Sequence, residues 1–201
     1  MEKDITIKSG PIRLEGRFFK GSEDRAAVIT HPHPLYGGNM DSPVVLAAQE
    51  AFLEKGFSTL RFNFRGTGES TGMFDDGKGE RTDVIKALAF VHETGIPSIH
   101  LAGYSFGAWV NAGALAENSI EVADHIMVSP PVAFLNFDDI TESFHTGLVV
   151  TGSDDTIAPP GLIRKYLEKW NSDTEIKILD GCDHFYAGFT ETLTRTITAY
   201  L

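Results

Sequence analysis

The sequence has few of the features that mark secreted or membrane-spanning proteins. It contains one cysteine, Cys182, so no disulfide bond can form within the chain. No stretch approaches the roughly 20 apolar residues that cross a bilayer. The first residues lack the apolar core of a signal peptide. We therefore expect a cytoplasmic protein with no membrane partner.

Positive charge is also scarce. The 17 Lys and Arg residues are outnumbered by 28 Asp and Glu residues, which gives a formal net charge of −11. Such a surface repels phosphate backbones, so we expect no nucleic-acid partner. Neither an internal repeat nor a Pro/Ser-rich linker divides the 201 residues, and the length suits one globular unit with a sizeable core. We predict a single domain over 1–201.

The apolar pattern changes after the first 25 residues. Residues 5–8 and 12–18 alternate apolar and polar, which is typical of half-exposed antiparallel strands. The run at 26–30 is continuous and apolar, which indicates a strand buried on both faces. Further predicted strands lie at 58–62, 98–102, 123–128, 148–151 and 175–179, and helical segments separate most of the strands. The pattern predicts an α/β fold: a mostly parallel, twisted sheet with an antiparallel N-terminal edge and helices on both faces.

The most informative motif is Gly-Tyr-Ser-Phe-Gly at residues 103–107. It follows a predicted strand and precedes a run of small, helix-tolerant residues. A Gly-x-Ser-x-Gly turn between a strand and a helix lifts the serine hydroxyl out of the backbone for attack. The two glycines are expected because strand and helix come too close for a Cβ atom. We predict that Ser105 is a nucleophile.

A second match, residues 68–72, also reads Gly-x-Ser-x-Gly. It lies in a polar, glycine-rich loop with no helix directly after it. We therefore interpret Ser70 as a loop serine.

A serine hydroxyl needs a base within hydrogen-bond reach, and the base needs a group that orients it. In open α/β sheets the reacting groups gather at the carboxyl ends of the strands. His184 follows the predicted strand at 175–179, downstream of Ser105, and is our candidate for the base. Of the other six histidines, His31 and His33 lie before Ser105, His92 lies in a helix, and His100 and His125 lie within strands, while His145, in a connector, remains an alternative.

Two adjacent aspartates follow the predicted strand that ends at Thr151. They cannot both face the histidine. We choose Asp155, three residues past Gly152, and keep Asp154 as the alternative.

Acyl transfer also needs N–H donors for the developing oxyanion. Phe106 directly follows the nucleophile and is the first candidate. The second is expected in the loop at 31–40, where Pro32 and Pro34 have no N–H to give. We predict Leu35 as the second donor, with Tyr36 as the alternative. The histidine pair at 31 and 33 has no third ligand at the usual spacing, so we predict no metal.

The segment after the strand ending at Val128 is short. Residues 129–146 are apolar but too few to form a large cap, so we predict an open site suited to small acyl substrates. Candidate pocket residues are Tyr36, Met40, Pro131, Phe134 and Phe185, and Phe144 adds to the apolar character of the segment.

Five motifs together resemble the α/β-hydrolase superfamily. They lie at 31–38, 61–70, 103–107, 152–159 and 183–185, so the resemblance covers most of the chain. It is closest to the small lidless bacterial hydrolases related to the dienelactone hydrolase group. The resemblance implies a triad of Ser105, Asp155 and His184 and no metal or organic cofactor. Dienelactone hydrolase has cysteine where this chain has Ser105, so its substrate is not carried over.

The sequence thus predicts a serine hydrolase that cleaves a carboxylic ester through an acyl-enzyme on Ser105. The same triad also serves peptidases, amidases and acyltransferases, and a fold of this kind can bind a ligand without turnover. These remain alternatives. The sequence indicates neither the natural substrate nor the oligomeric state.

Overall fold

A computed structural model of the chain describes residues 1–117, 121–138, 146–170 and 173–201. Within these residues the strands form an eight-stranded sheet in the order β1-β2-β4-β3-β5-β6-β7-β8. The strands are β1 (Lys3–Ser9), β2 (Ile12–Phe19), β3 (Arg25–Thr30), β4 (Ser58–Phe62), β5 (Ser98–Tyr104), β6 (Asp124–Val128), β7 (Leu148–Gly152) and β8 (Glu175–Leu179). β2 is antiparallel to both neighbours, and all other pairs are parallel. The predicted mostly parallel sheet with an antiparallel N-terminal edge is confirmed.

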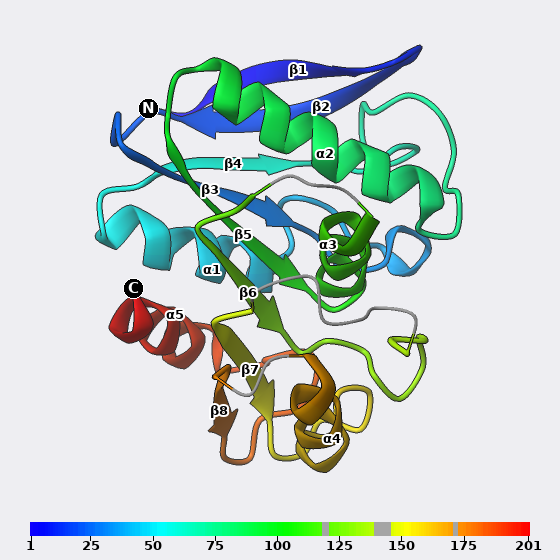
Figure 1. The fold of residues 1–201 in the computed structure, drawn as a ribbon, viewed down its shortest axis with the longest axis vertical. Helices are drawn as coiled ribbons and strands as arrows, with labels where there is room; N and C mark the ends of the chain where they lie inside the picture. The colour runs from blue at the N-terminus through cyan, green and yellow to red at the C-terminus, as the bar shows by residue number, and fades with distance from the viewer. Residues whose placement is uncertain (118–120, 139–145, 171–172) are drawn as a thin grey trace.

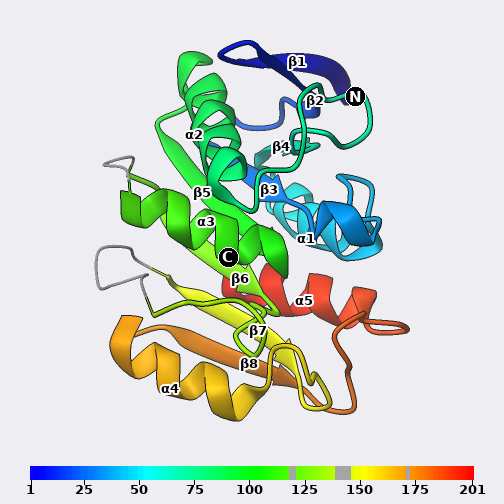
Figure 2. The same ribbon diagram turned by 90° about the vertical axis from the view of Figure 1, so that its right-hand side faces the viewer.

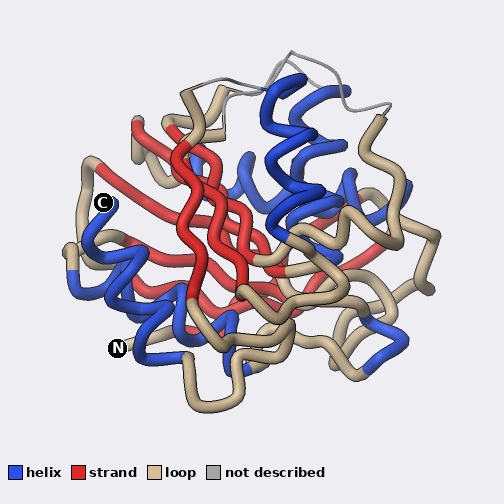
Figure 3. The backbone as a smooth tube through the Cα atoms, turned by 90° about the horizontal axis from the view of Figure 1, so that it is seen from below, coloured by secondary structure: helices blue, strands red, loops and turns tan. Residues whose placement is uncertain are grey.

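Helices cover both faces of this sheet. Helices α1 (Pro43–Glu54) and α5 (Thr190–Tyr200) pack on one face, while α2 (Lys78–Glu93), α3 (Phe106–Glu117) and α4 (Pro160–Trp170) pack on the other (Figures 1 and 2). Seen along the sheet, the strands form a central layer between the helices (Figure 3). Two apolar cores result, one on each side of the sheet. None of the helices in the described ranges is long and apolar enough to cross a membrane.

Local sequence explains where α1 begins and ends. Pro43 occupies the first turn, where its missing N–H costs no hydrogen bond. Gly56 follows the helix with a φ of 77°, a conformation that glycine adopts without strain. Ser42 holds the N-cap position, but its hydroxyl accepts from the backbone N–H of Asn39 (3.2 Å) instead of capping the helix. The start of α1 is thereby tied to the loop that follows β3.

The long loop after β4 is fixed by a buried ion pair. The Arg65 guanidinium donates to both carboxylate oxygens of Asp83 on α2, at 3.0 and 2.8 Å. Asp83 is fully buried and also accepts from the hydroxyl of Ser9 (3.1 Å). Because α2 belongs to the core, this contact holds the loop at 63–77 against the carboxyl edge of the sheet.

Candidate active site

The turn at Ser105 is strained and tightly enclosed. Ser105 has a φ of 52°, which costs a non-glycine residue on the order of 1–3 kcal/mol. A Cβ on Gly103 would lie 2.7 Å from the backbone nitrogen of Ala108, and a Cβ on Gly107 would lie 2.8 Å from the carbonyl oxygens of Thr30 and His31. Only glycine fits at either position, as the motif predicts.

The structure brings the three predicted triad residues together. The Nε2 atom of His184 lies 2.9 Å from the hydroxyl oxygen of Ser105. The Nδ1 atom of His184 lies 2.9 Å from Oδ2 of Asp155. The Asp154 carboxylate instead accepts from the Ser153 hydroxyl (2.9 Å). Of the two candidate acids, Asp155 is therefore the one bonded to the imidazole.

The loop after β7 presents Asp155 to the histidine. The backbone N–H groups of Ile157 and Ala158 donate to its Oδ1 atom at 2.9 and 2.7 Å. Burial by itself raises the pKa of Asp155, but its hydrogen bonds and the facing imidazole of His184 outweigh burial and lower the pKa below the usual range. The carboxylate is therefore charged and able to stabilise a protonated His184.

Three further residues support this arrangement, and sequence reasoning missed them. The Tyr104 hydroxyl donates to the carbonyl of His184 (2.8 Å). The hydroxyls of Ser129 and Tyr186 bond each other (2.8 Å), and both residues have positive φ, 46° and 57°. The Ser129 hydroxyl also helps to lower the pKa of Asp155. The available signal was position, because Ser129 directly follows the buried strand β6.

The predicted second oxyanion donors are used elsewhere. Residues Pro34–Tyr36 form a single 3₁₀ turn. Within it the Leu35 N–H donates to Nδ1 of His33 (3.2 Å), and the Tyr36 N–H donates to the carbonyl of His33 (3.1 Å). Both N–H groups that we predicted as the second donor are therefore bonded within the turn, and that assignment stays a prediction.

The backbone N–H of His33 has no such partner in the described part of the chain. It stands between Pro32 and Pro34, which have none to offer. The preceding carbonyls, those of Thr30 and His31, lie against Gly107 of the serine turn, and the His33 ring lies 4.7 Å from that of Phe106. Phe106 begins α3, so its N–H has no acceptor four residues back in the helix. Two N–H groups are thus available beside Ser105.

The His31 side chain links two loops of the structure. Its Nε2 atom accepts the backbone N–H of Phe64 (3.0 Å), and its Nδ1 atom lies 2.7 Å from the carbonyl of Pro32. The ring is fully buried, and burial lowers its pKa to about 4. Neutral His31 therefore joins the loop after β3 to the loop after β4.

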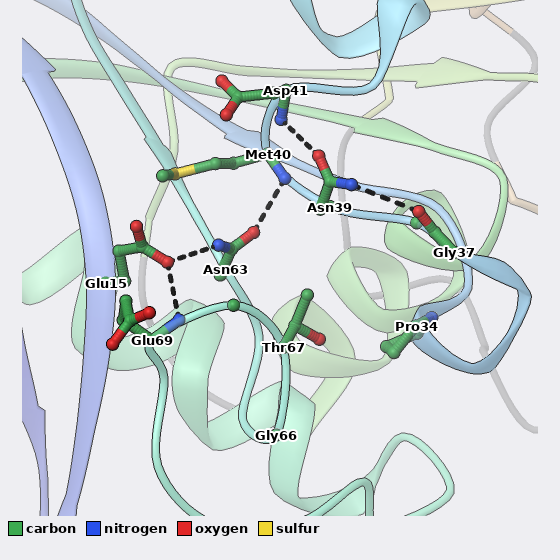
Figure 4. A pocket seen from close by; sticks show the side chains of 12 residues that line it. Glu15, Pro34, Gly37, Asn39, Met40, Asp41, Asn63, Gly66, Thr67 and Glu69 are labelled. Atoms are coloured by element: carbon green, nitrogen blue, oxygen red, sulfur yellow. Dashed lines mark hydrogen bonds between the residues drawn. The ribbon is translucent and has the colours of Figure 1, made fainter.

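A hollow of about 610 Å³ lies between the loop after β3, at residues 34–41, and the loop after β4, at residues 63–69 (Figure 4). The Asn63 side chain accepts from the Met40 N–H (2.8 Å) and donates to the carboxylate of Glu15 (2.7 Å). Ser105 is not in its lining. These polar groups bond one another and hold two loops together.

Among the five predicted pocket residues, Met40 lines the hollow described above. Met40 is buried, and its contact with a substrate stays a prediction. Tyr36, Phe134 and Phe185 are strongly exposed on loops at the carboxyl edge, at 88%, 72% and 69%, while Pro131 is buried. Their contact with a substrate stays a prediction. Phe144 and His145 lie outside the described residues.

The sequence and the fold both have relatives among known proteins, although no family model matches the chain. An uncharacterised protein from Rickettsia prowazekii is 33% identical, with 94% of this chain and 84% of that protein covered. An α/β serine hydrolase homologue from Coxiella burnetii is also 33% identical, covering 99% of this chain and 97% of its own, with a TM-score of 0.90.

The chain belongs to the α/β serine hydrolase family. A member without a lid, from Xanthomonas campestris, is 28% identical and matches 99% of this chain and 93% of its own at a TM-score of 0.89. An esterase from Pyrococcus furiosus, 18% identical, covers 100% of this chain and 91% of its own at a TM-score of 0.82, and it shows the fold alone. The resemblance to small lidless α/β-hydrolases is confirmed, while the link to dienelactone hydrolase stays a prediction.

Replacing Ser70 should weaken the fold without touching the serine turn. The Ser70 hydroxyl donates to the carbonyl of Asn63 (2.8 Å) and accepts from the N–H of Glu15 (2.9 Å). Ser70→Ala should lower the free energy of unfolding by about 1–3 kcal/mol, because two backbone groups lose their partner. Urea denaturation measures this. Unchanged stability of the Ser70→Ala protein would show that these bonds contribute nothing.

His31 should make stability depend on pH. Its pKa is lowered in the fold from 6.5 to about 4, so the unfolded chain binds the proton more readily. The free energy of unfolding should fall by about 3 kcal/mol on this account as the pH drops from 6.5 to 4. His31→Gln keeps an acceptor for Phe64 but does not titrate. Equal pH dependence in the two proteins, measured by denaturation at several pH values, would refute this assignment.

Proposed function

We propose that this protein is a serine hydrolase that cleaves carboxylic esters of small acyl substrates through an acyl-enzyme on Ser105. The observation that carries the proposal is the continuous chain of hydrogen bonds from Asp155 through His184 to the Ser105 hydroxyl. The strained turn, which orients this hydroxyl for nucleophilic attack, adds support. An esterase with the same fold makes ester hydrolysis a chemistry that this scaffold carries elsewhere.

The first half of the reaction forms the acyl-enzyme. The Ser105 hydroxyl donates its proton to Nε2 of His184 as the oxygen attacks the ester carbonyl. Asp155 accepts the Nδ1–H bond, fixes the tautomer and stabilises the charged imidazole. The N–H groups of Phe106 and His33 donate hydrogen bonds to the carbonyl oxygen, on which negative charge develops. His184 then returns the proton to the leaving alcohol.

The second half releases the acid. Water attacks the acyl-enzyme while His184 takes its proton, and Ser105 leaves with a proton from the same imidazole. Exposed side chains such as Phe134 and Phe185 at the carboxyl edge suit an open site that water reaches. Access of water favours hydrolysis over transfer of the acyl group to another acceptor.

Labelling tests the nucleophile. A fluorophosphonate probe should form an adduct on the peptide containing Ser105, and hydrolysis of p-nitrophenyl acetate should fall to background in Ser105→Ala. Ser70→Ala is the matched control and should still be labelled. An unlabelled wild-type protein whose activity equals that of Ser105→Ala would reject the hydrolase proposal in favour of ligand binding without turnover. Parallel ester, amide and peptide panels would then rank the substrates.

The adjacent aspartates provide a paired test of the acid. Asp155→Asn should lower kcat for ester hydrolysis by about 10³–10⁴, because the amide cannot support the charged imidazole. Asp154→Asn should have little effect, since this carboxylate bonds Ser153 instead. Steady-state kinetics of both variants decide the matter. Equal losses in the two proteins would remove Asp155 from the mechanism.

A further inference from the structure

The side chain of His33 fills a specific place beside the serine turn. Its ring is surrounded by three aromatic rings, with centroid distances of 4.7 Å to Phe106, 4.8 Å to Tyr36 and 5.0 Å to Phe74. These rings come from α3, from the 3₁₀ turn and from the loop at 63–77. The loop is held in turn by Arg65 and Asp83. The imidazole therefore has little freedom to change its direction.

The same ring closes the turn that follows it. Its Nδ1 atom accepts the N–H of Leu35 (3.2 Å), so the side chain acts as the N-cap of the 3₁₀ turn. An acceptor nitrogen carries no proton, so His33 is neutral with its proton on Nε2. The carbonyl of His33 accepts from Tyr36 and from Gly38 (3.1 Å each). Side chain and carbonyl are thus both committed to the turn, while the backbone N–H of His33 is not.

We propose that the His33 side chain is a positioning residue for oxyanion binding, which caps the turn and so directs the N–H of its own backbone toward the carbonyl attacked by Ser105. This inference rests on the proposed ester hydrolysis. Protonation of the ring places a proton on Nδ1, which then cannot accept from Leu35. The cap is therefore present only while His33 is neutral, and the oxyanion donor loses its support when the ring is charged.

The surroundings keep the cap intact at neutral pH. Burial lowers the pKa of His33, and the Asp76 carboxylate partly opposes this by raising it. Neighbouring His31 is neutral in the same range because burial lowers its pKa to about 4. The ring also contacts the aromatic rings of Phe74 and Phe106. Since the pKa is lowered from 6.5, the neutral form dominates at pH 7, and charging occurs only as the medium becomes acidic.

Two substitutions separate capping from packing. His33→Phe keeps an aromatic ring between the neighbours but has no acceptor for Leu35. Its kcat should fall about tenfold with KM nearly constant, because a displaced oxyanion donor weakens only the transition state. His33→Asn offers an amide oxygen, a good N-cap acceptor, and should recover at least about fivefold in kcat over His33→Phe.

The pH profile gives a second readout. In the wild-type protein, charging of His33 removes the roughly tenfold contribution of the cap in addition to the loss of the general base, so the logarithm of kcat/KM should fall at acidic pH with a local slope that rises above 1, to about 1.5, where His33 takes up its proton. His33→Asn cannot titrate at this position, and its slope should be about 1. A purely structural role for His33 would leave the two slopes equal.

A measurement without substrate tests the cap itself. In ¹⁵N-labelled wild-type protein the Leu35 amide signal should shift with pH in step with the His33 ring signals. Equal kcat for His33→Asn and His33→Phe, equal slopes, or a Leu35 amide that ignores the His33 titration would overturn the proposal. Inactivity of the wild-type protein would instead reject the proposed function, and the amide titration would still decide the cap. It also decides the matter if His33→Phe fails to fold.

Discussion

The close crossing of β5, α3 and the end of β3 is the constraint on which the rest of the site depends. At Gly103 and Gly107 the backbones approach so closely that no Cβ fits. This crossing forces Ser105 into a left-handed conformation, and backbone bonds from Ser105 to Val128 and from Ala108 to Ser105 hold it there. Surrounding structure thus compensates a local strain of a few kcal/mol. The nucleophile is aimed before any substrate arrives, and so no reorganisation is needed during attack.

Much of the fold was predictable because its signals are local. The continuous apolar run at 26–30 and the alternation at 5–8 and 12–18 distinguished a buried parallel strand from the antiparallel edge, and Pro43 and Gly56 marked the limits of α1. The order of Ser105, Asp155 and His184 along the chain also anticipated their meeting, since the carboxyl ends of parallel strands share one edge of the sheet. Spacing alone preferred Asp155 over Asp154. The physical reason appears only in three dimensions, where two backbone N–H groups turn Asp155 toward the imidazole.

The loop after β3 was harder to predict. Counting N–H groups suggested Leu35 and Tyr36, but a side-chain acceptor on His33 draws the Leu35 group into a turn. This hydrogen bond depends on the side-chain rotamer of His33, which the sequence pattern does not predict. Met40 illustrates a related limit, because it is apolar and lies in the predicted oxyanion loop, yet the Asn63 side chain accepts from its backbone N–H. Composition predicts that a side chain prefers an apolar environment but not which neighbouring residues provide it.

The base of the triad follows β8, an edge strand with several exposed positions. Edge elements open more readily than the centre of a sheet. The loop carrying His184 is nevertheless tied to the centre by two phenols. Tyr104 at the end of β5 bonds the carbonyl of His184, and fully buried Tyr186 bonds Ser129 behind β6. Local opening of the edge strand β8 therefore need not change the orientation of the His184 imidazole, and the triad geometry is kept when the edge of the sheet opens.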